Sequence, residues 1–224
     1  MSHIHKLSQE EAHKIAAGEV VERPASIVKE LLENALDAGA TSITVDITDG
    51  GRQRIRISDN GHGMDRDDVR LAIEQHTTSK LHSCQELPHI TSYGFRGEAL
   101  SSISAISHFS IASQRHGDPE GTLLTVSYEE GIHEQVTSRA PGTEITVDNI
   151  FYNIPARKKF LKKRETEWRA IQQLCIAMAL HRTDCTFYVY HDSKKALHCP
   201  AAYDKKERLA QIHDTYFAQH FITC

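Results

Sequence analysis

Cysteine is scarce in this sequence and shows no pairing pattern. The 224 residues include five cysteines, an odd number, widely spread and without a Cys-x-x-Cys pair: Cys84, Cys175, Cys185, Cys199 and Cys224. This spacing argues against a disulfide framework and against a zinc ribbon. A reducing, cytoplasmic compartment is therefore the expectation.

Long apolar runs and a dominant charge are also absent. No stretch approaches the roughly 18 apolar residues of a membrane span, and the N-terminus lacks the apolar region of a signal peptide. The 26 Lys+Arg against 30 Asp+Glu give a net charge of -4, which excludes a uniformly basic nucleic-acid binder but not a local basic patch. With 39% hydrophobic and 25% charged residues, the composition is that of a globular protein.

Familiar metal and nucleotide signatures are missing. The 15 histidines form no HExxH motif and no paired ligand spacing, which argues against a histidine metal site. No GxxxxGK[ST] loop occurs, and Arg66 stands where a GxGxxG motif starting at Gly61 needs its third glycine. A Walker A nucleotide site and a Rossmann fold are both disfavoured.

The hydrophobic periodicity predicts an α+β protein. Apolar residues at helical spacing follow Pro24 up to Gly39, and alternating residues over 43–57 around Asp49-Gly50-Gly51 indicate a hairpin. Further predicted elements are helices over 65–75, 98–106, 164–181 and from 204, and strands over 109–113, 122–128, 132–137, 144–147 and, as the last, 186–190. Because most strands follow one another without a helix between them, a layered sandwich with mostly antiparallel pairing is expected.

Two polar motifs accompany the first helix and the hairpin. Glu30 and Asn34 lie one helical turn apart, with Asp37 close by, as either a solvated face or a carboxylate base beside an amide oxygen able to hold Mg²⁺. Asp59-Asn60-Gly61-His62-Gly63 at the end of the second strand is either a plain turn or an acceptor with a close-approaching backbone for a flat amine-bearing ligand such as adenine.

A third motif, Gly94-Phe95-Arg96-Gly97-Glu98-Ala99-Leu100, precedes a predicted helix. Free N–H groups at such a helix start favour phosphate, although a capping turn has the same pattern. The aperiodic stretch from 76 to 97 before the helix has the length of a functional loop.

Five segments follow one another along the chain: ELLENALDAGA, DNGHGM, HTTSK, GFRGEAL and PGTEI. Together and in this order they resemble the GHKL ATPases, the superfamily of type II topoisomerase ATPase subunits, Hsp90, histidine kinases and MutL. Within this superfamily, three longer segments are similar to the N-terminal ATPase region of MutL-type DNA mismatch repair proteins: IAAGEVVERPASIVKELLENALDAGA, SYGFRGEALSSI and YNIPARKKFL. The resemblance covers about residues 13–200.

The resemblance implies the GHKL (Bergerat) fold, an α+β two-layer sandwich with a mixed, mostly antiparallel sheet and helices on one face. It implies ATP and Mg²⁺ as ligands, with Glu30 as the general base, Asn34 as the Mg²⁺ ligand and Asp59 as the adenine acceptor. The other nucleotide-binding residues implied are Gly61, Gly63, Met64, Thr78 and Thr143 near adenine, and Gly94, Phe95, Arg96, Gly97, Ala99 and Leu100 at the phosphates.

For the organisation of the chain, the resemblance implies an ATPase domain over 1–200, with a mobile segment at 1–20 and an ATP lid at 76–98, followed at 201–224 by the start of a second domain. Since the family's phosphate-contacting lysine comes from that second domain, weak hydrolysis is expected here. ATP binding would order the lid and drive homodimerisation. The implied partners are DNA, a mismatch-recognition protein of the MutS type, and a downstream repair helicase or nuclease, with no membrane.

A local basic cluster is the candidate DNA contact. It comprises Arg157, Lys158, Lys159, Lys162 and Lys163. A solvated helix face is the other reading of such a run. Two alternatives to a mismatch-repair ATPase also stay open: a non-catalytic, nucleotide-gated scaffold for DNA or proteins, and another GHKL enzyme such as a topoisomerase subunit or a histidine kinase.

Overall fold

The computed structural model of the chain describes residues 9–74, 77, 97–127 and 129–212. Within them a single sheet has the strand order β5-β4-β3-β6-β2-β1-β7-β8. Its strands are β1 Ser42–Thr48, β2 Arg54–Asp59, β3 His108–Gln114, β4 Gly121–Ser127, β5 Gly131–Thr137, β6 Gly142–Asp148, β7 Thr186–His191 and β8 Lys194–Cys199. All neighbours pair antiparallel except β1 and β7, which are parallel.

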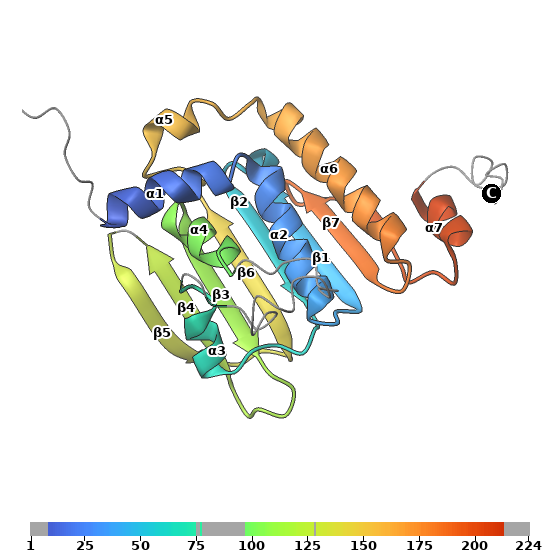
Figure 1. Cartoon of the computed structure of the whole chain (residues 1–224). Helices are drawn as coiled ribbons and strands as arrows, with labels where there is room; N and C mark the ends of the chain where they lie inside the picture. Colours follow the sequence, from blue (N-terminus) through green and yellow to red (C-terminus); the bar gives the residue numbers. More distant parts are fainter. Residues whose placement is uncertain (1–8, 75–76, 78–96, 128, 213–224) are drawn as a thin grey trace, which may run out of the picture.

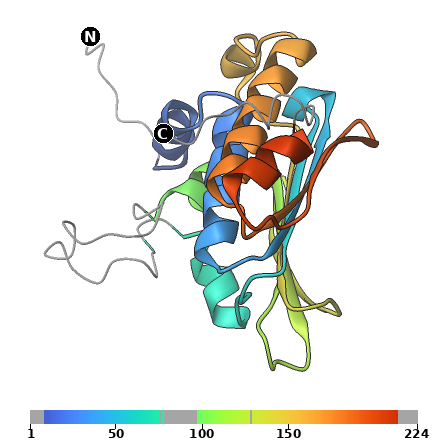
Figure 2. The same ribbon diagram turned by 90° about the vertical axis from the view of Figure 1, so that its right-hand side faces the viewer.

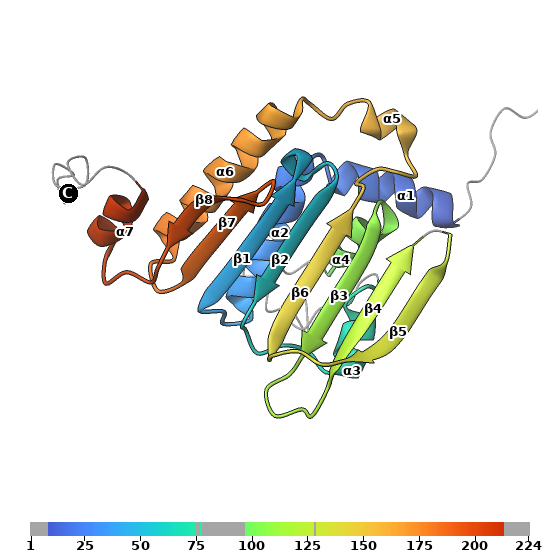
Figure 3. The same ribbon diagram turned by 180° about the vertical axis from the view of Figure 1, so that it is seen from behind.

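The helices cover one face of this sheet, and the other face is open (Figures 1 and 3). They are α1 Gln9–Val20, α2 Pro24–Asp37, α3 Arg66–Leu71, α4 Ala99–Ala105, α5 Pro155–Lys158, α6 Arg164–His181 and α7 Lys205–Ile212, with a 3-10 turn, η1, at Asp49–Gly51. Seen edge-on, helices and sheet form two layers (Figure 2). The predicted α+β sandwich with a mixed, mostly antiparallel sheet is confirmed.

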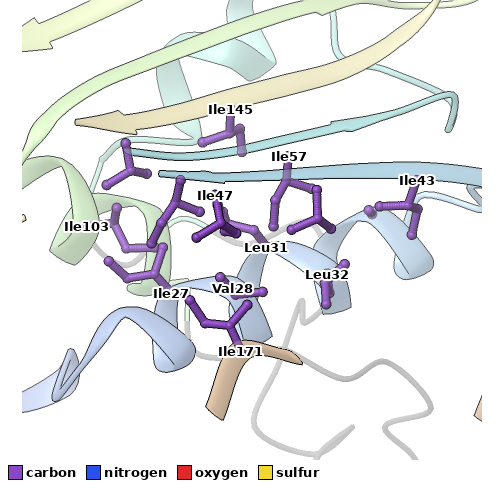
Figure 4. Close-up of a cluster of buried hydrophobic side chains, with 14 of the residues drawn as sticks. Ile27, Val28, Leu31, Leu32, Ile43, Ile47, Ile57, Ile103, Ile145 and Ile171 are labelled. Carbon is purple, nitrogen blue, oxygen red and sulfur yellow. The ribbon is translucent and has the colours of Figure 1, made fainter. Parts of the chain in front are cut away.

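The core lies between α2, α6 and the middle strands. In Figure 4, Ile27 and Leu31 of α2 face the strand residues Ile47 and Ile57, while Val28 lies beside Ile171 of α6. All six side chains are at most 3% exposed. Each contributes about 1.5–3 kcal/mol through burial, so the apolar stripe of α2 holds the helix firmly on the sheet.

The hairpin prediction is confirmed in register as well as in place. Val45 pairs with Ile57, and Ile47 with Ile55, so the alternating isoleucines and valines all point to the helix side. The polar partners on the open face form cross-strand ion pairs, with Arg56 on Asp46 and Arg54 on Asp148. This alternation makes one face of the sheet the core and the other a polar surface.

Three elements are absent from the sequence prediction: α1, β8 and the four-residue helix α5. The strand at 186–190 is not the last, because β8 follows it after a two-residue turn in which Asp192 and Ser193 have φ of 48° and 64°. That turn has no glycine and β8 is mostly exposed, so neither a hairpin glycine nor apolar alternation marks it. Helix α1 was not predicted either; its apolar face is short, with Ala17 buried.

α7 confirms the helix expected from 204. It is fixed by Arg208, whose guanidinium is fully buried and donates to the carbonyl oxygens of Cys199, Thr183 and Cys185 at 3.0, 2.9 and 2.7 Å. None of the helices in the described part of the chain is long and apolar enough to cross a membrane.

Candidate functional site

Helix α2 separates an apolar from a polar side. Glu30, Asn34 and Asp37 are all partly exposed on the side away from the core. Between them, Glu33 is 7% exposed and pairs with Lys29 at 3.4 Å. Burial raises the pKa of Glu33 above its usual value, while Lys29 opposes that rise. Glu33 was not a candidate from the sequence, since its burial depends on the packing around α2.

Asp59 ends β2 directly opposite Thr143 of β6. Its Oδ1 accepts a hydrogen bond from the Gly61 N–H at 2.8 Å, and the backbone N–H of Thr143 donates to the same carboxylate. Burial raises the pKa of Asp59, and these two hydrogen bonds and the charge of Arg139 counteract the rise. The carboxylate is thus a preorganised acceptor at a strand end, held by backbone donors.

The loop after Asp59 is pressed between two other elements. The His62 N–H donates to the carbonyl oxygen of Ala38, just beyond the end of α2, at 2.9 Å. On the other side, Gly63 has φ +69°, and a Cβ there would lie 2.0 Å from the carbonyl oxygen of Gln114. A side chain fits neither the conformation nor the space, so this close approach requires glycine.

A buried serine connects this loop to β6. Ser113 of β3 is fully buried, and its Oγ accepts from the Met64 N–H at 2.8 Å. The same hydroxyl lies 2.9 Å from Thr143 Oγ1 and 3.1 Å from the Gly142 carbonyl oxygen. Ser113 therefore ties Met64 and Thr143, both predicted near adenine, into one network. No local sequence pattern distinguishes Ser113 from an ordinary strand serine.

Arg139 is the cation of this region. Its guanidinium is partly buried and donates to the carbonyl oxygen of Ala112 on β3. Burial lowers the pKa of Arg139, and the charges of Glu144 and Asp59 partly restore it. The residue sits in the loop between β5 and β6, and its proximity to Asp59 arises only when the sheet brings β2, β3 and β6 together.

The predicted phosphate segment is described only from Gly97 onward. Gly97 lies just before α4, and Ala99 and Leu100 form its first turn. α4 packs against α1, and its Ile103 reaches the core beside Ile27 (Figure 4). The predicted site residues Thr78, Gly94, Phe95 and Arg96, and nearly all of the predicted lid, lie outside the described residues.

These groups fit an adenine nucleotide in chemistry. Asp59 supplies a carboxylate acceptor at a strand end, and the Ser113 hydroxyl holds the backbone of Met64 and Gly142 beside it. For Mg²⁺, the described residues contain no group of three or more His, Cys, Asp or Glu that could hold a metal ion. An ion here would need the amide oxygen of Asn34 together with ligand phosphates, a set of hard oxygens that suits Mg²⁺.

Comparison with known proteins identifies the fold family. Residues 22–152 match the family described as "Histidine kinase-, DNA gyrase B-, and HSP90-like ATPase". The chain belongs to this ATPase family. It is 50% identical over 94% of its length to the DNA mismatch repair protein MutL of Trichlorobacter lovleyi and 46% identical over 99% to that of Gemmatimonas aurantiaca, and it spans 36% of each relative.

Solved structures agree with that assignment. The Aquifex aeolicus MutL ATPase domain complexed with ADP has a TM-score of 0.68 and 30% identity, covering 86% of this chain and 69% of that one. The N-terminal domain of a DNA repair protein has a TM-score of 0.75 and 28% identity, covering 90% of this chain and 60% of that one. The predicted resemblance to MutL-type GHKL ATPase regions is confirmed.

The basic cluster of this ATPase-family chain lies away from Asp59. α5 follows β6, at the end of the sheet opposite the pair of Asp59 and Thr143 (Figure 1). Lys158, Lys159, Lys162 and Lys163 are exposed, whereas Arg157 is partly buried against Gly18 of α1, where a Cβ would lie 3.4 Å from Arg157 Nε. Four of the five candidate DNA contacts therefore face solvent and the fifth helps to pack α1.

Proposed function

We propose that this chain is the ATP-binding and ATP-hydrolysing part of a DNA mismatch repair protein. The observation that carries the proposal is the Asp59 site: a carboxylate held by backbone donors, beside a glycine loop packed against the end of α2. Membership of an ATPase family and similarity to MutL proteins support the same conclusion. Since the chain spans about a third of those relatives, the repair function is that of a longer protein.

Each residue would have a distinct role. Asp59 accepts a hydrogen bond from the adenine amine, and Gly61, Gly63, Met64, Thr78 and Thr143 shape the surrounding pocket. Main-chain N–H groups of Gly94, Phe95, Arg96, Gly97, Ala99 and Leu100 face the phosphates. Glu30 orients the attacking water and accepts its proton, while Asn34 holds Mg²⁺, which neutralises phosphate charge when bound. Positioning and electrostatics, without a covalent intermediate, are sufficient for such a reaction.

As a switch, the domain would respond to ATP by ordering the segment at 76–98 and forming a homodimer. How far ATP shifts the equilibrium from monomer to homodimer depends on how much more tightly it binds the homodimer. We place the domain boundary near residue 200 and assign residues 201–224 to the start of a second domain that supplies a phosphate-contacting lysine. The proposed setting is the cytoplasm, with DNA, a MutS-type protein and a repair helicase or nuclease as partners.

Two substitutions separate nucleotide binding from hydrolysis. Asp59→Asn should weaken ATP binding about tenfold, because the amide has one acceptor oxygen in place of the two that serve the backbone N–H groups and the adenine amine. Glu30→Ala should retain ATP binding and lose hydrolysis, and Glu22→Ala, an exposed carboxylate before α2, is the matched control. Binding is measured by fluorescent-nucleotide titration and hydrolysis by phosphate release.

Hydrolysis should be slow in this chain and faster in a version extended by the following domain. Equal rates in the two would contradict the role of the second domain. If wild-type protein binds ATP in both forms without turnover, and Glu30→Ala changes nothing, the non-catalytic scaffold is the correct function. Unchanged ATP binding in Asp59→Asn would overturn the assignment of the adenine site.

A further inference from the structure

The most exposed phenylalanine of the described chain lies inside the basic cluster. We define the basic turn as residues 158–163, which begin at the last residue of α5 and lead into α6. Phe160 in this turn is 82% exposed, whereas the next residue, Leu161, packs against the hydrophobic core. The turn thus buries one apolar side chain and presents the other to solvent, with a lysine directly before Phe160 and two after Leu161.

Four consecutive backbone hydrogen bonds hold the part of the turn that carries Phe160. The N–H groups of Lys158 and Lys159 donate to Ile154 and Pro155, and those of Phe160 and Leu161 donate to Arg157 and Lys158, at 2.9–3.3 Å. These bonds fix the direction in which the Cα–Cβ bond of Phe160 leaves the backbone, while Leu161 occupies the neighbouring position against the core. The exposure is therefore a property of a defined turn.

A buried carboxylate binds the backbone near the C-terminal end of the basic turn. Glu167 of α6 is 1% exposed, and its Oε1 accepts from the Lys162 N–H at 3.0 Å. Its Oε2 accepts from Nε and Nη2 of Arg23 at 3.0 and 2.8 Å, just before α2 begins. Glu167 thereby joins the basic turn to the sequence that starts α2, and both oxygens are fully used.

The charge around Phe160 is uncompensated. Lys158, Lys159, Lys162 and Lys163 are exposed, and no described carboxylate forms an ion pair with any of them. A ligand for this surface must therefore be a polyanion that also offers a flat apolar face. The other large apolar side chains that are exposed in the described residues lie on other elements: Ile15 and Val20 on α1, Leu71 on α3, Ile132 and Val136 on β5, and Tyr203 before α7. Within the turn itself four lysines flank Phe160, which favours a polyanion over an apolar protein surface.

We propose that Phe160 is the base-contacting residue of the basic turn: the lysines bind DNA phosphates while an unpaired base stacks on its ring. This inference rests on the proposed DNA binding by the basic cluster and assigns its chemistry. In a duplex each base face is covered by its neighbours, so only single-stranded or gapped DNA offers a face to the ring. Stacking on an aromatic side chain is sequence-tolerant because every base has a π-face.

The test compares single-stranded oligothymidine with a blunt duplex of equal length at low salt, by fluorescence anisotropy. Phe160→Ala should weaken single-strand binding about tenfold and change duplex binding less than twofold. Phe160→Trp should retain single-strand affinity. Val136→Ala removes a side chain that is 63% exposed on β5, and it should change neither affinity.

The failure of the DNA site and the failure of the stacking role are distinguishable. If replacing Lys158, Lys159, Lys162 and Lys163 by Glu leaves DNA binding unchanged, the basic cluster is not a DNA contact and both proposals are wrong. If the lysine changes abolish binding but Phe160→Ala affects both DNA forms equally or neither, only the stacking role is overturned. Phe160-dependent binding to anionic vesicles, with unaltered DNA affinity, would also overturn it in favour of a lipid surface.

Discussion

The two ends of α2 are held by different kinds of contact. Beyond its C-terminal end, the Asp59 loop is fitted by backbone close approach, with Gly63 against Gln114 and His62 bonded to Ala38. At its N-terminal end, Arg23 and the basic turn are joined by the side chain of Glu167. The first end therefore tolerates almost no added volume, whereas the second depends on one buried charge.

The largest effect is expected from adding a methyl group at the crowded end. Gly63→Ala should destabilise the fold by about 4 kcal/mol, because the new Cβ meets a backbone carbonyl oxygen at 2.0 Å. Gly39→Ala is the matched control: its φ of +72° is nearly the same as the +69° of Gly63, but nothing lies within 4 Å of its Cβ. It should cost about 1 kcal/mol. Urea unfolding measures the free energy of unfolding of both variants. Equal losses would mean that the positive φ, and not the contact with Gln114, causes the destabilisation.

A smaller effect is expected from the charged end. Glu167→Ala should lower the free energy of unfolding by about 3 kcal/mol, because it leaves the Lys162 N–H and the Arg23 guanidinium without their acceptor. Glu165→Ala, an exposed residue in the same helical turn, is the control and should be nearly neutral. The loss in Glu167→Ala should come with weaker DNA binding and little change in ATP affinity. If ATP affinity falls and DNA binding does not, the contacts of Glu167 with Arg23 and Lys162 serve the nucleotide site instead.

The smallest stability effect is expected at Asp59, and its size depends on pH. Because burial raises the pKa of Asp59 in the folded chain, the folded state holds the proton more tightly than the unfolded one. The stabilisation is fully present below the unfolded pKa and is lost as pH rises through the folded pKa. Asp59→Asn has no carboxyl group to titrate at this position. Its free energy of unfolding relative to wild type should therefore rise as the pH goes from acid to neutral. Urea titrations across that range measure the difference, and a gain toward acid pH would contradict it.

Local sequence patterns were enough for much of the fold. The apolar spacing after Pro24 and over 164–181 predicts α2 and α6, since helical period and burial coincide there. β8 could not be predicted, because an exposed edge strand needs no apolar alternation. The proximity of Asp59 to Gly61 and Met64 is local, but their connection to Thr143 through Ser113 requires three strands to be side by side.

Motifs and periodicity are properties of neighbours along the chain, so the sequence alone predicts the family, most of the elements and the candidate residues for nucleotide and DNA. Which polar side chains are buried and which lysines form no ion pair follows only from the packed fold. Glu167 is an ordinary acidic residue in the sequence, and it becomes the link between the basic turn and α2 through contacts 5 and 144 residues away. Burial and long-range pairing depend on the packed sheet and helices, so no local pattern encodes them.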